Sequence, residues 1–260
     1  MTTARKGVVY LVGAGPGDPE LLTRKAADLL ATADVILHDD LVPQAILELA
    51  GSQARVTSVG KRCGARRITQ EKIHALMIGD ARRGCSVVRL KSGDPLIFGR
   101  AAEEMDALDQ AGVPCEVVPG VTAMFAAAAA VRKSLTDRRS ASKVILTTAH
   151  HVANAGGPSG PSFWSGPLPE DATLGIYMPG RNLGALAEQM FDAGMPPDLP
   201  CLVVSHISLP GQRTQATVLG KLAKLAPGPA PLLVLAGWPL AEAEVAAGAS
   251  ASISTDAIPH

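Results

Sequence analysis

An alternation between short apolar runs and longer segments with helical periodicity constrains this chain more than any other feature. Residues 8–12 form an apolar run that ends in a glycine-rich turn, and apolar side chains then recur at helical spacing over residues 21–33. Short buried strands that alternate with amphipathic helices are typical of an α/β fold. The sequence therefore predicts an α/β protein.

The same pattern predicts the elements and the division of the chain. Strands are expected at residues 8–12, 35–37, 86–90, 116–118, 144–147, 173–178, 201–205 and 232–236, and helices at 19–33, 69–83, 101–111, 121–131 and 182–193. We expect an N-terminal α/β lobe over residues 1–119, a C-terminal α/β lobe over residues 120–240 and a mobile tail over residues 241–260. Residues 151–171, rich in Gly, Pro and Ser, are expected to form a loop.

The composition disfavours several classes of function. Lys plus Arg and Asp plus Glu number 24 each, so no net charge draws the whole chain toward nucleic acid or an acidic membrane surface. Hydrophobic residues make up 47% of the chain, which is ample for a buried core. The first apolar run, residues 8–12, is far too short for a signal peptide or a membrane span. We therefore expect a soluble cytoplasmic protein that binds neither nucleic acid nor membrane.

Cysteines and histidines predict no metal centre. The four cysteines, Cys63, Cys85, Cys115 and Cys201, are widely spaced and form no C-x-x-C pair. Those within or beside apolar runs are expected to be buried structural thiols. His150 and His151 are adjacent at the end of an expected strand, where neighbouring side chains point to opposite faces. They are therefore poorly placed to share a metal ion.

The glycine-rich turn at residues 13–17 follows a strand and precedes a helix, as in dinucleotide-binding proteins. Its glycines are spaced G-x-G-x-G, however, and not G-x-G-x-x-G, and Pro16 lacks the N–H group that a phosphate would accept. Asp39, at the end of the next strand, could still bind a ribose. A dinucleotide-dependent oxidoreductase, or a plain tight turn without ligand, therefore remains an alternative interpretation of this turn.

Several segments that occur in one order resemble signatures of the tetrapyrrole methylase family. They are Leu11–Pro19 (LVGAGPGDP), Asp39–Val42 (DDLV), Val59–Arg62 (VGKR) with Gln70-Glu71 after it, Arg89–Arg100 (RLKSGDPLIFGR) with Glu103-Glu104 after it, and Val118–Ala123 (VPGVTA). Each motif alone is weak, but five in order between residue 8 and about residue 125 are specific. The combination is most similar to those members of the family that methylate uroporphyrinogen III.

The resemblance implies a fold, a cofactor and an assembly. The family fold has two α/β lobes, with S-adenosylmethionine bound in the cleft between them, and the enzymes are usually homodimers. By matching position, the resemblance implies that the cofactor contacts Pro16, Ser92, Gly93, Asp94, Ile97, Thr122, Ala123, Met178 and Ile207. The implied reaction is the C-methylation of uroporphyrinogen III at C-2 and C-7, which yields precorrin-2 for siroheme or cobalamin synthesis, with S-adenosylhomocysteine as the second product.

The resemblance also implies which residues act on the substrate. Asp39 would be the general base and Lys61 the general acid that handle the proton of the methylated ring. Uroporphyrinogen carries a ring of carboxylates, which arginine side chains can bind in bidentate fashion. The basic residues near the motifs that we expect to bind these carboxylates are Arg62, Arg66, Arg67, Arg138 and Arg139. A solvated basic surface is the simpler interpretation of such a cluster.

Departures from the family pattern concern mainly the acceptor. Ser92 occupies a usual glycine position, His38 replaces a tyrosine, and residues 135–138 read L-T-D-R in place of L-T-H-R. The cofactor half of the pattern is therefore better matched than the half that shapes the substrate pocket. Another corrin-precursor methylase and a non-catalytic ligand-binding module remain alternatives to the uroporphyrinogen III enzyme.

Overall fold

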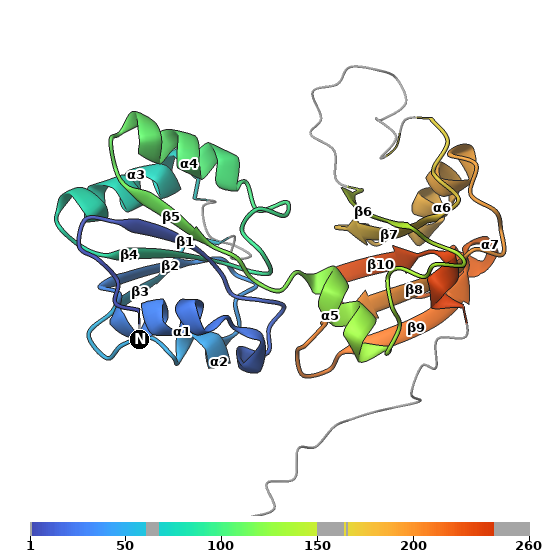
Figure 1. Cartoon of the computed structure of the whole chain (residues 1–260), viewed down its shortest axis with the longest axis horizontal. Coiled ribbons are helices and arrows are strands. Elements are labelled where there is room, and N and C mark those ends of the chain that lie inside the picture. Colours follow the sequence, from blue (N-terminus) through green and yellow to red (C-terminus); the bar gives the residue numbers. More distant parts are fainter. Residues whose placement is uncertain (1, 61–67, 150–163, 165, 242–260) are drawn as a thin grey trace, which may run out of the picture. The chain divides into compact units, whose positions relative to one another are not determined.

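The computed structural model describes residues 2–60, 68–149, 164 and 166–241 (Figure 1). The chain divides into two compact units: Met1–Ala129 with Ile207–Leu209, and Ala130–His206 with Pro210–His260. The predicted division at residues 119–120 therefore lies ahead of the observed one, because most of helix α5 (Ala123–Ala130) groups with the first unit. The predicted mobile tail lies almost wholly outside the described residues.

The first unit is built on a five-stranded sheet with the order β3-β2-β4-β1-β5. Its strands are β1 (Val9–Gly13), β2 (Val35–His38), β3 (Arg55–Ser58), β4 (Val87–Lys91) and β5 (Cys115–Val118), and every neighbouring pair is parallel. The carboxyl ends of all five strands therefore lie at the same edge. Strand β3 was absent from the predicted elements because it is a half-exposed edge strand with polar residues at three of its positions.

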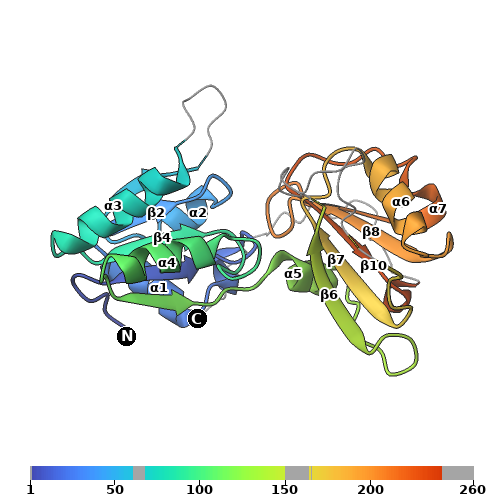
Figure 2. The same ribbon diagram turned by 90° about the horizontal axis from the view of Figure 1, so that it is seen from above.

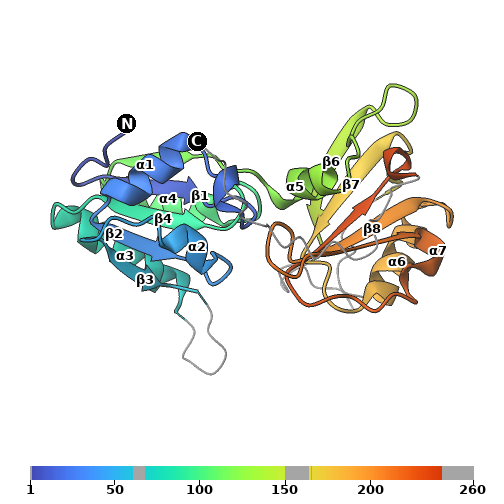
Figure 3. The same cartoon turned by 90° about the horizontal axis from the view of Figure 1, so that it is seen from below.

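Helices cover both faces of this sheet, as parallel sheets require. The helical elements are η1 (Pro19–Leu21), α1 (Arg24–Thr32), α2 (Gln44–Leu47), α3 (Gln70–Arg82) and α4 (Ala101–Gln110), followed by α5. Figures 1 to 3 show α1 and α2 on one face and α3 and α4 on the other. Alternate residues of β1 enter the two cores: Tyr10 and Val12 pack on the α1 side, and Val9 and Leu11 on the α3 side.

Capping residues explain where the helices begin. Thr69 accepts a hydrogen bond from the N–H of Lys72 and begins α3, as the sequence predicts. The single helix predicted over residues 19–33 is wrong. Asp18 caps only the short 3₁₀ turn η1, and Thr23 caps α1 separately through the N–H of Ala26. Two local capping side chains thus divide an apolar pattern that is continuous in the sequence.

The second unit has a mixed five-stranded sheet with the order β6-β7-β10-β8-β9. Its elements are β6 (Lys143–Thr148), β7 (Ala172–Tyr177), α6 (Leu183–Asp192), β8 (Pro200–Ser205), β9 (Arg213–Val218), α7 (Leu219–Leu222), β10 (Leu232–Ala236) and η2 (Trp238–Leu240). Strands β6 and β7 are parallel and the other pairs antiparallel. Helices α6 and α7 pack on one apolar core with β7, β8 and β10. The half-exposed edge strand β9 was also not predicted.

The predicted class, an α/β fold with two lobes, is confirmed. Cys201 is buried as expected, and burial raises the pKa of its thiol to about 12. Burial likewise raises the pKa of the partly buried Cys115 to about 11, so neither thiol supplies a nucleophilic thiolate near neutral pH. Within the described ranges, no helix has the length and apolar character needed to cross a membrane.

Candidate active site

The turns that follow β1, β4 and β5 are joined to one another at the carboxyl edge of the first sheet. Gly15 N–H donates to Gly93 O over 3.1 Å, and Gly93 N–H donates back to Gly15 O over 2.7 Å. Gly120 N–H, after β5, donates to the Asp94 carboxylate over 2.9 Å. Ligands of open parallel sheets bind outside the carboxyl ends of the strands, and these joined turns therefore form the candidate site.

Glycine is required where these backbones meet. A Cβ atom on Gly13 would lie 2.6 Å from Gly120 N and 2.7 Å from Gly93 O, and a Cβ on Gly120 would meet Gly93 O still more closely. Gly93 differs from both: its φ is +70°, and no heavy atom lies within 4 Å of its Cβ position. Gly13 and Gly120 thus permit close packing of backbone, whereas Gly93 leaves open space at the edge of the sheet.

Asp94 holds two of these turns. Its Oδ1 accepts from Leu96 N–H over 2.8 Å, and its Oδ2 accepts from Gly120 N–H over 2.9 Å. The carboxylate therefore acts as a turn residue between the ends of β4 and β5. Each oxygen has a second lone pair, so a further hydrogen bond to a ligand is chemically compatible with this arrangement.

Most of the predicted cofactor residues gather at this edge. Those that follow β1, β4 and β5 are Pro16, Ser92, Gly93, Asp94, Ile97, Thr122 and Ala123. Pro16 and Thr122 are buried, and the other five are partly buried. Ile207 is also buried, in the short segment that groups with the first unit. Met178 belongs to the second unit, where it follows β7 with a left-handed backbone conformation and is 49% exposed.

Asp39 follows β2 at the same edge, and a buried arginine holds it. Its backbone N–H donates to Leu90 O over 3.2 Å, and its Oδ1 accepts from Arg89 Nη2 over 2.5 Å. Arg89 also donates through Nε to Glu104 over 3.1 Å, and Lys91 Nζ donates to both oxygens of Glu104 over 2.9 Å. The predicted base is thus the partly exposed end of a buried ionic cluster.

The sequence prediction of the site did not include Arg89, Lys91 and Glu104. Two cations at alternate positions of an otherwise apolar strand were the available signal, because such a strand of a parallel sheet is buried on both faces. Burial lowers the pKa of Lys91, with a further lowering from Arg89, and the Glu104 carboxylate opposes both. The cluster therefore depends on Glu104 to compensate two buried cations.

The structure describes only two of the predicted cationic residues. The predicted general acid, Lys61, and the predicted substrate-binding residues Arg62, Arg66 and Arg67 lie outside the described residues. Arg138 and Arg139 are exposed residues of the second unit. Arg139 forms a 2.7 Å ion pair with Asp137 and lowers the pKa of that carboxyl to about 2. Arg139 is thus engaged by a neighbouring carboxylate, and its role in substrate binding stays a prediction.

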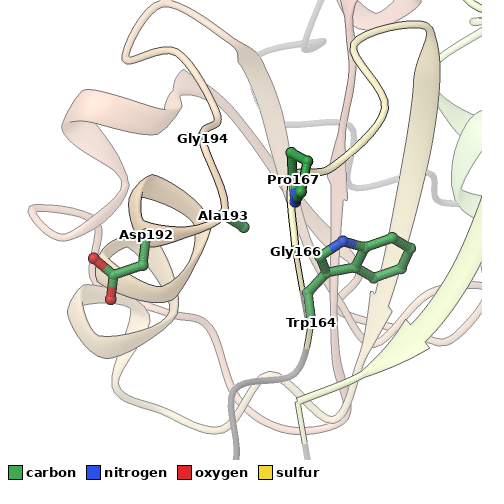
Figure 4. A pocket seen from close by; sticks show the side chains of 6 residues that line it. All are labelled: Trp164, Gly166, Pro167, Asp192, Ala193 and Gly194. Atoms are coloured by element: carbon green, nitrogen blue, oxygen red, sulfur yellow. The ribbon is translucent and has the colours of Figure 1, made fainter.

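A cavity of about 480 Å³ lies elsewhere, within the second unit (Figure 4). Its lining residues are Trp164, Gly166, Pro167, Asp192, Ala193 and Gly194. None of the predicted site residues is among them. Within the part of the chain that the structure describes, no cluster of His, Cys, Asp and Glu has the arrangement of a metal site, and His150 and His151 fall outside that part.

Comparison with known proteins identifies the class to which this fold and site belong. The family model of the tetrapyrrole (corrin/porphyrin) methylases matches residues 8–223. The chain is 43% identical to a uroporphyrinogen-III C-methyltransferase of Paracoccus denitrificans, over 93% of this chain and 84% of that protein. It is also 43% identical to a siroheme synthase of Halorhodospira halophila, over 86% of this chain but only 45% of that protein.

A solved structure gives the same result. The uroporphyrin-III C-methyltransferase of Thermus thermophilus, in complex with S-adenosyl homocysteine, superposes with a TM-score of 0.73 at 36% identity, over 89% of this chain and 98% of that one. The chain spans about half the length of several other curated relatives. The chain belongs to the tetrapyrrole methylase family, which confirms the resemblance in the motifs and disfavours the dinucleotide-dependent oxidoreductase.

Proposed function

We propose that this protein catalyses the S-adenosylmethionine-dependent C-methylation of uroporphyrinogen III at C-2 and C-7, yielding precorrin-2 for siroheme or cobalamin synthesis. The observation that carries the proposal is the set of joined turns after β1, β4 and β5, with Asp39 at the same edge of the sheet. The names of the relatives from Paracoccus, Halorhodospira and Thermus support the substrate and the cofactor.

The joined turns fit a cofactor that carries an adenosine and an amino acid. The open space beside Gly93 allows close approach of a ligand to the backbone, and Asp94 retains lone pairs for a ribose or an ammonium group. The residues proposed to hold it are Pro16, Ser92, Gly93, Asp94, Ile97, Thr122, Ala123, Met178 and Ile207. When bound, S-adenosylmethionine supplies the activated methyl group. Most of the protein's contribution is then to position the acceptor carbon and to exclude water.

The methylated pyrrole ring must release or redistribute a proton, and we assign that task to Asp39 as general base, with Lys61 as general acid. One third of the Asp39 side chain is exposed at the edge of the sheet, so a substrate can reach it. We further propose that Arg62, Arg66, Arg67, Arg138 and Arg139 bind the carboxylates of the substrate and that the protein acts as a homodimer.

The test is turnover with enzymatically generated uroporphyrinogen III and S-adenosylmethionine, followed by S-adenosylhomocysteine release and product mass. Two added methyl groups are expected. The variant Asp39→Asn should bind S-adenosylhomocysteine as the parent does, measured by calorimetry, but its kcat should fall by about 10²–10⁴-fold.

The neighbouring Asp40→Asn serves as the matched control, because Asp40 is exposed and pairs with Ser58 instead of Arg89. A parent chain that binds S-adenosylhomocysteine without turnover would favour a ligand-binding module. A parent chain that does not bind S-adenosylmethionine at all would overturn the proposal. Full activity in Asp39→Asn would remove Asp39 from the mechanism.

A further inference from the structure

Strand β4 carries two cations into the interior of the first unit. The side chains of Arg89 and Lys91 are each 3% exposed, and Glu104, which compensates them from α4, is fully buried. Charged groups are costly to remove from water, and buried ion pairs can often be replaced by apolar side chains without loss of stability. Stability alone is therefore a weak explanation for the placement of this cluster in the middle of the sheet.

Every nitrogen of the Arg89 guanidinium has a hydrogen-bond acceptor. Nε donates to Glu104 over 3.1 Å, and Nη2 donates to Asp39 over 2.5 Å. Nη1 donates to the carbonyl oxygens of Leu37 and Leu90 over 3.4 and 3.3 Å. A planar guanidinium that is held at all three nitrogens has one orientation, so its Nη2 offers Asp39 Oδ1 a donor at a fixed position.

Glu104 anchors the guanidinium from behind. Its Oε1 accepts from Gln70 Nε2 over 3.1 Å as well as from Arg89, and both oxygens accept from Lys91 Nζ over 2.9 Å. Helices α3 and α4 and strand β4 therefore all contribute to the position of Arg89. A lysine in its place has a single donor nitrogen, so it cannot reproduce the separate fixed contacts that Nε, Nη1 and Nη2 of Arg89 make.

We propose that Arg89, fixed by Glu104, is the positioning residue of Asp39. Arg89 engages Oδ1 and restrains its position, while Oδ2 has no hydrogen-bond partner among the residues that the structure describes. One oxygen of the base is thus held and the other is left for the proton of the methylated ring. The inference rests on the proposed role of Asp39, and it adds a buried relay that runs from α4 through β4 to the end of β2.

A second buried carboxylate in the same unit, Asp80, pairs with arginines away from the candidate site and can be compared with the Arg89 cluster. Asp80 of α3, whose side chain is 2% exposed, pairs with Arg55 over 2.5 Å and with Arg83. Arg55 is the first residue of β3 and pairs in register with Val35 at the start of β2, so it lies at the opposite end of these strands from Asp39. Arg55 thus contacts a buried carboxylate, as Arg89 does, without contacting the candidate site.

The experiment compares Arg89→Lys with Arg55→Lys in the full chain. Arg89→Lys should lower kcat by about tenfold or more, while the KM for S-adenosylmethionine and the calorimetric Kd for S-adenosylhomocysteine stay within about twofold of the parent values. Arg55→Lys should leave kcat unchanged, even if its melting temperature falls. Glu104→Asp keeps the charge but withdraws it from Arg89, and it should lower kcat by about threefold or more at unchanged Kd.

The outcomes separate this inference from the proposed function. Normal kcat in both Arg89→Lys and Glu104→Asp, in a background where Asp39→Asn is impaired, would overturn the positioning role alone. Equal losses of kcat in Arg89→Lys and Arg55→Lys, or failure of both cluster variants to fold, would assign the cluster to stability and would also overturn it. A parent chain without methyltransferase activity would instead refute the proposed function.

Discussion

The two units differ in what they bury. Among the described residues, the buried charged side chains, Asp80, Arg89, Lys91 and Glu104, all belong to the first unit. The buried polar side chains of the second unit are the hydroxyl residues Thr173 and Ser205, and its core is otherwise apolar. Two sheets of five strands can thus be stabilised with or without buried charge. The difference supports our proposal that the cluster of Arg89, Lys91 and Glu104 serves the candidate site, whereas Asp80 is a buried charge away from that site.

The largest effect that we expect on stability comes from Glu104→Ala. The change would leave Arg89 and Lys91 buried without their shared anion, and breaking a buried ion pair costs about 3–5 kcal/mol. Urea unfolding would measure the loss. The adjacent Glu103→Ala is the control, since Glu103 forms a half-exposed pair with Arg100 whose loss should cost about 0–1 kcal/mol.

A substitution in the apolar core of the second unit can be compared with Glu104→Ala in the first unit. Leu174→Ala, at a position that is 1% exposed, should cost about 2–5 kcal/mol by leaving a cavity. Unlike Glu104→Ala, it should leave the kcat of the folded fraction unchanged. A loss of kcat in Leu174→Ala at a temperature where the protein is folded would contradict the contrast between the units.

Gly120→Ala should have a smaller effect on stability and a direct effect on the candidate site. Its Cβ would collide with the backbone at Gly93 and Gly13, and overpacking of this kind costs about 1–3 kcal/mol. We expect S-adenosylhomocysteine binding to weaken at least tenfold in calorimetry, because the joined turns must separate. Gly79→Ala in α3 is the matched control. Its Cβ would meet only the flexible Arg83 side chain, at 3.5 Å, and should stabilise the helix by up to about 1 kcal/mol.

A smaller effect on stability is expected at Asp34, a partly exposed carboxylate of the first unit that pairs with the exposed Lys6. The Lys6 ammonium, then the hydroxyl and N–H of Ser86, lower the pKa of Asp34 from 3.8 to about 2. Because the folded pKa is the lower one, the stabilisation is present above about pH 4 and is lost as the pH falls toward 2. Asp34→Asn should therefore lower the free energy of unfolding by about 1 kcal/mol at pH 7, after allowance for solvent screening, and should match the parent near pH 2.

Asp137 of the second unit provides a second lowered carboxyl pKa with which Asp34 can be compared. Its pKa is also lowered to about 2, chiefly by the exposed Arg139 guanidinium. Asp137→Asn should lower the free energy of unfolding less than Asp34→Asn does. Added salt should abolish the effect of Asp137→Asn, because the Asp137–Arg139 pair is open to solvent. Equal and salt-independent effects at the two positions would contradict this expectation.

The local sequence determined much of the fold of this protein. The apolar strands of both sheets, the Thr69 cap and the glycine turns after β1, β4 and β5 follow from residue patterns within a few positions of one another. The family motifs also mark Asp39 and the turns that surround Gly93. The edge strands β3 and β9 were not predictable in this way, because their half-exposed positions carry polar residues that show no strand periodicity.

Only the tertiary structure decided which groups meet at the site. Arg89 and Asp39 are 50 positions apart, and Gln70 and Glu104 are 34 positions apart. They come together because parallel strands end at one edge and because α3 and α4 cover the same face. Local sequence patterns cannot predict these contacts, because each contact depends on the strand order β3-β2-β4-β1-β5 and on the packing of the helices over the sheet. The sequence thus specified the turns and the proposed base, Asp39, and the packed sheet supplied the arginine that contacts it.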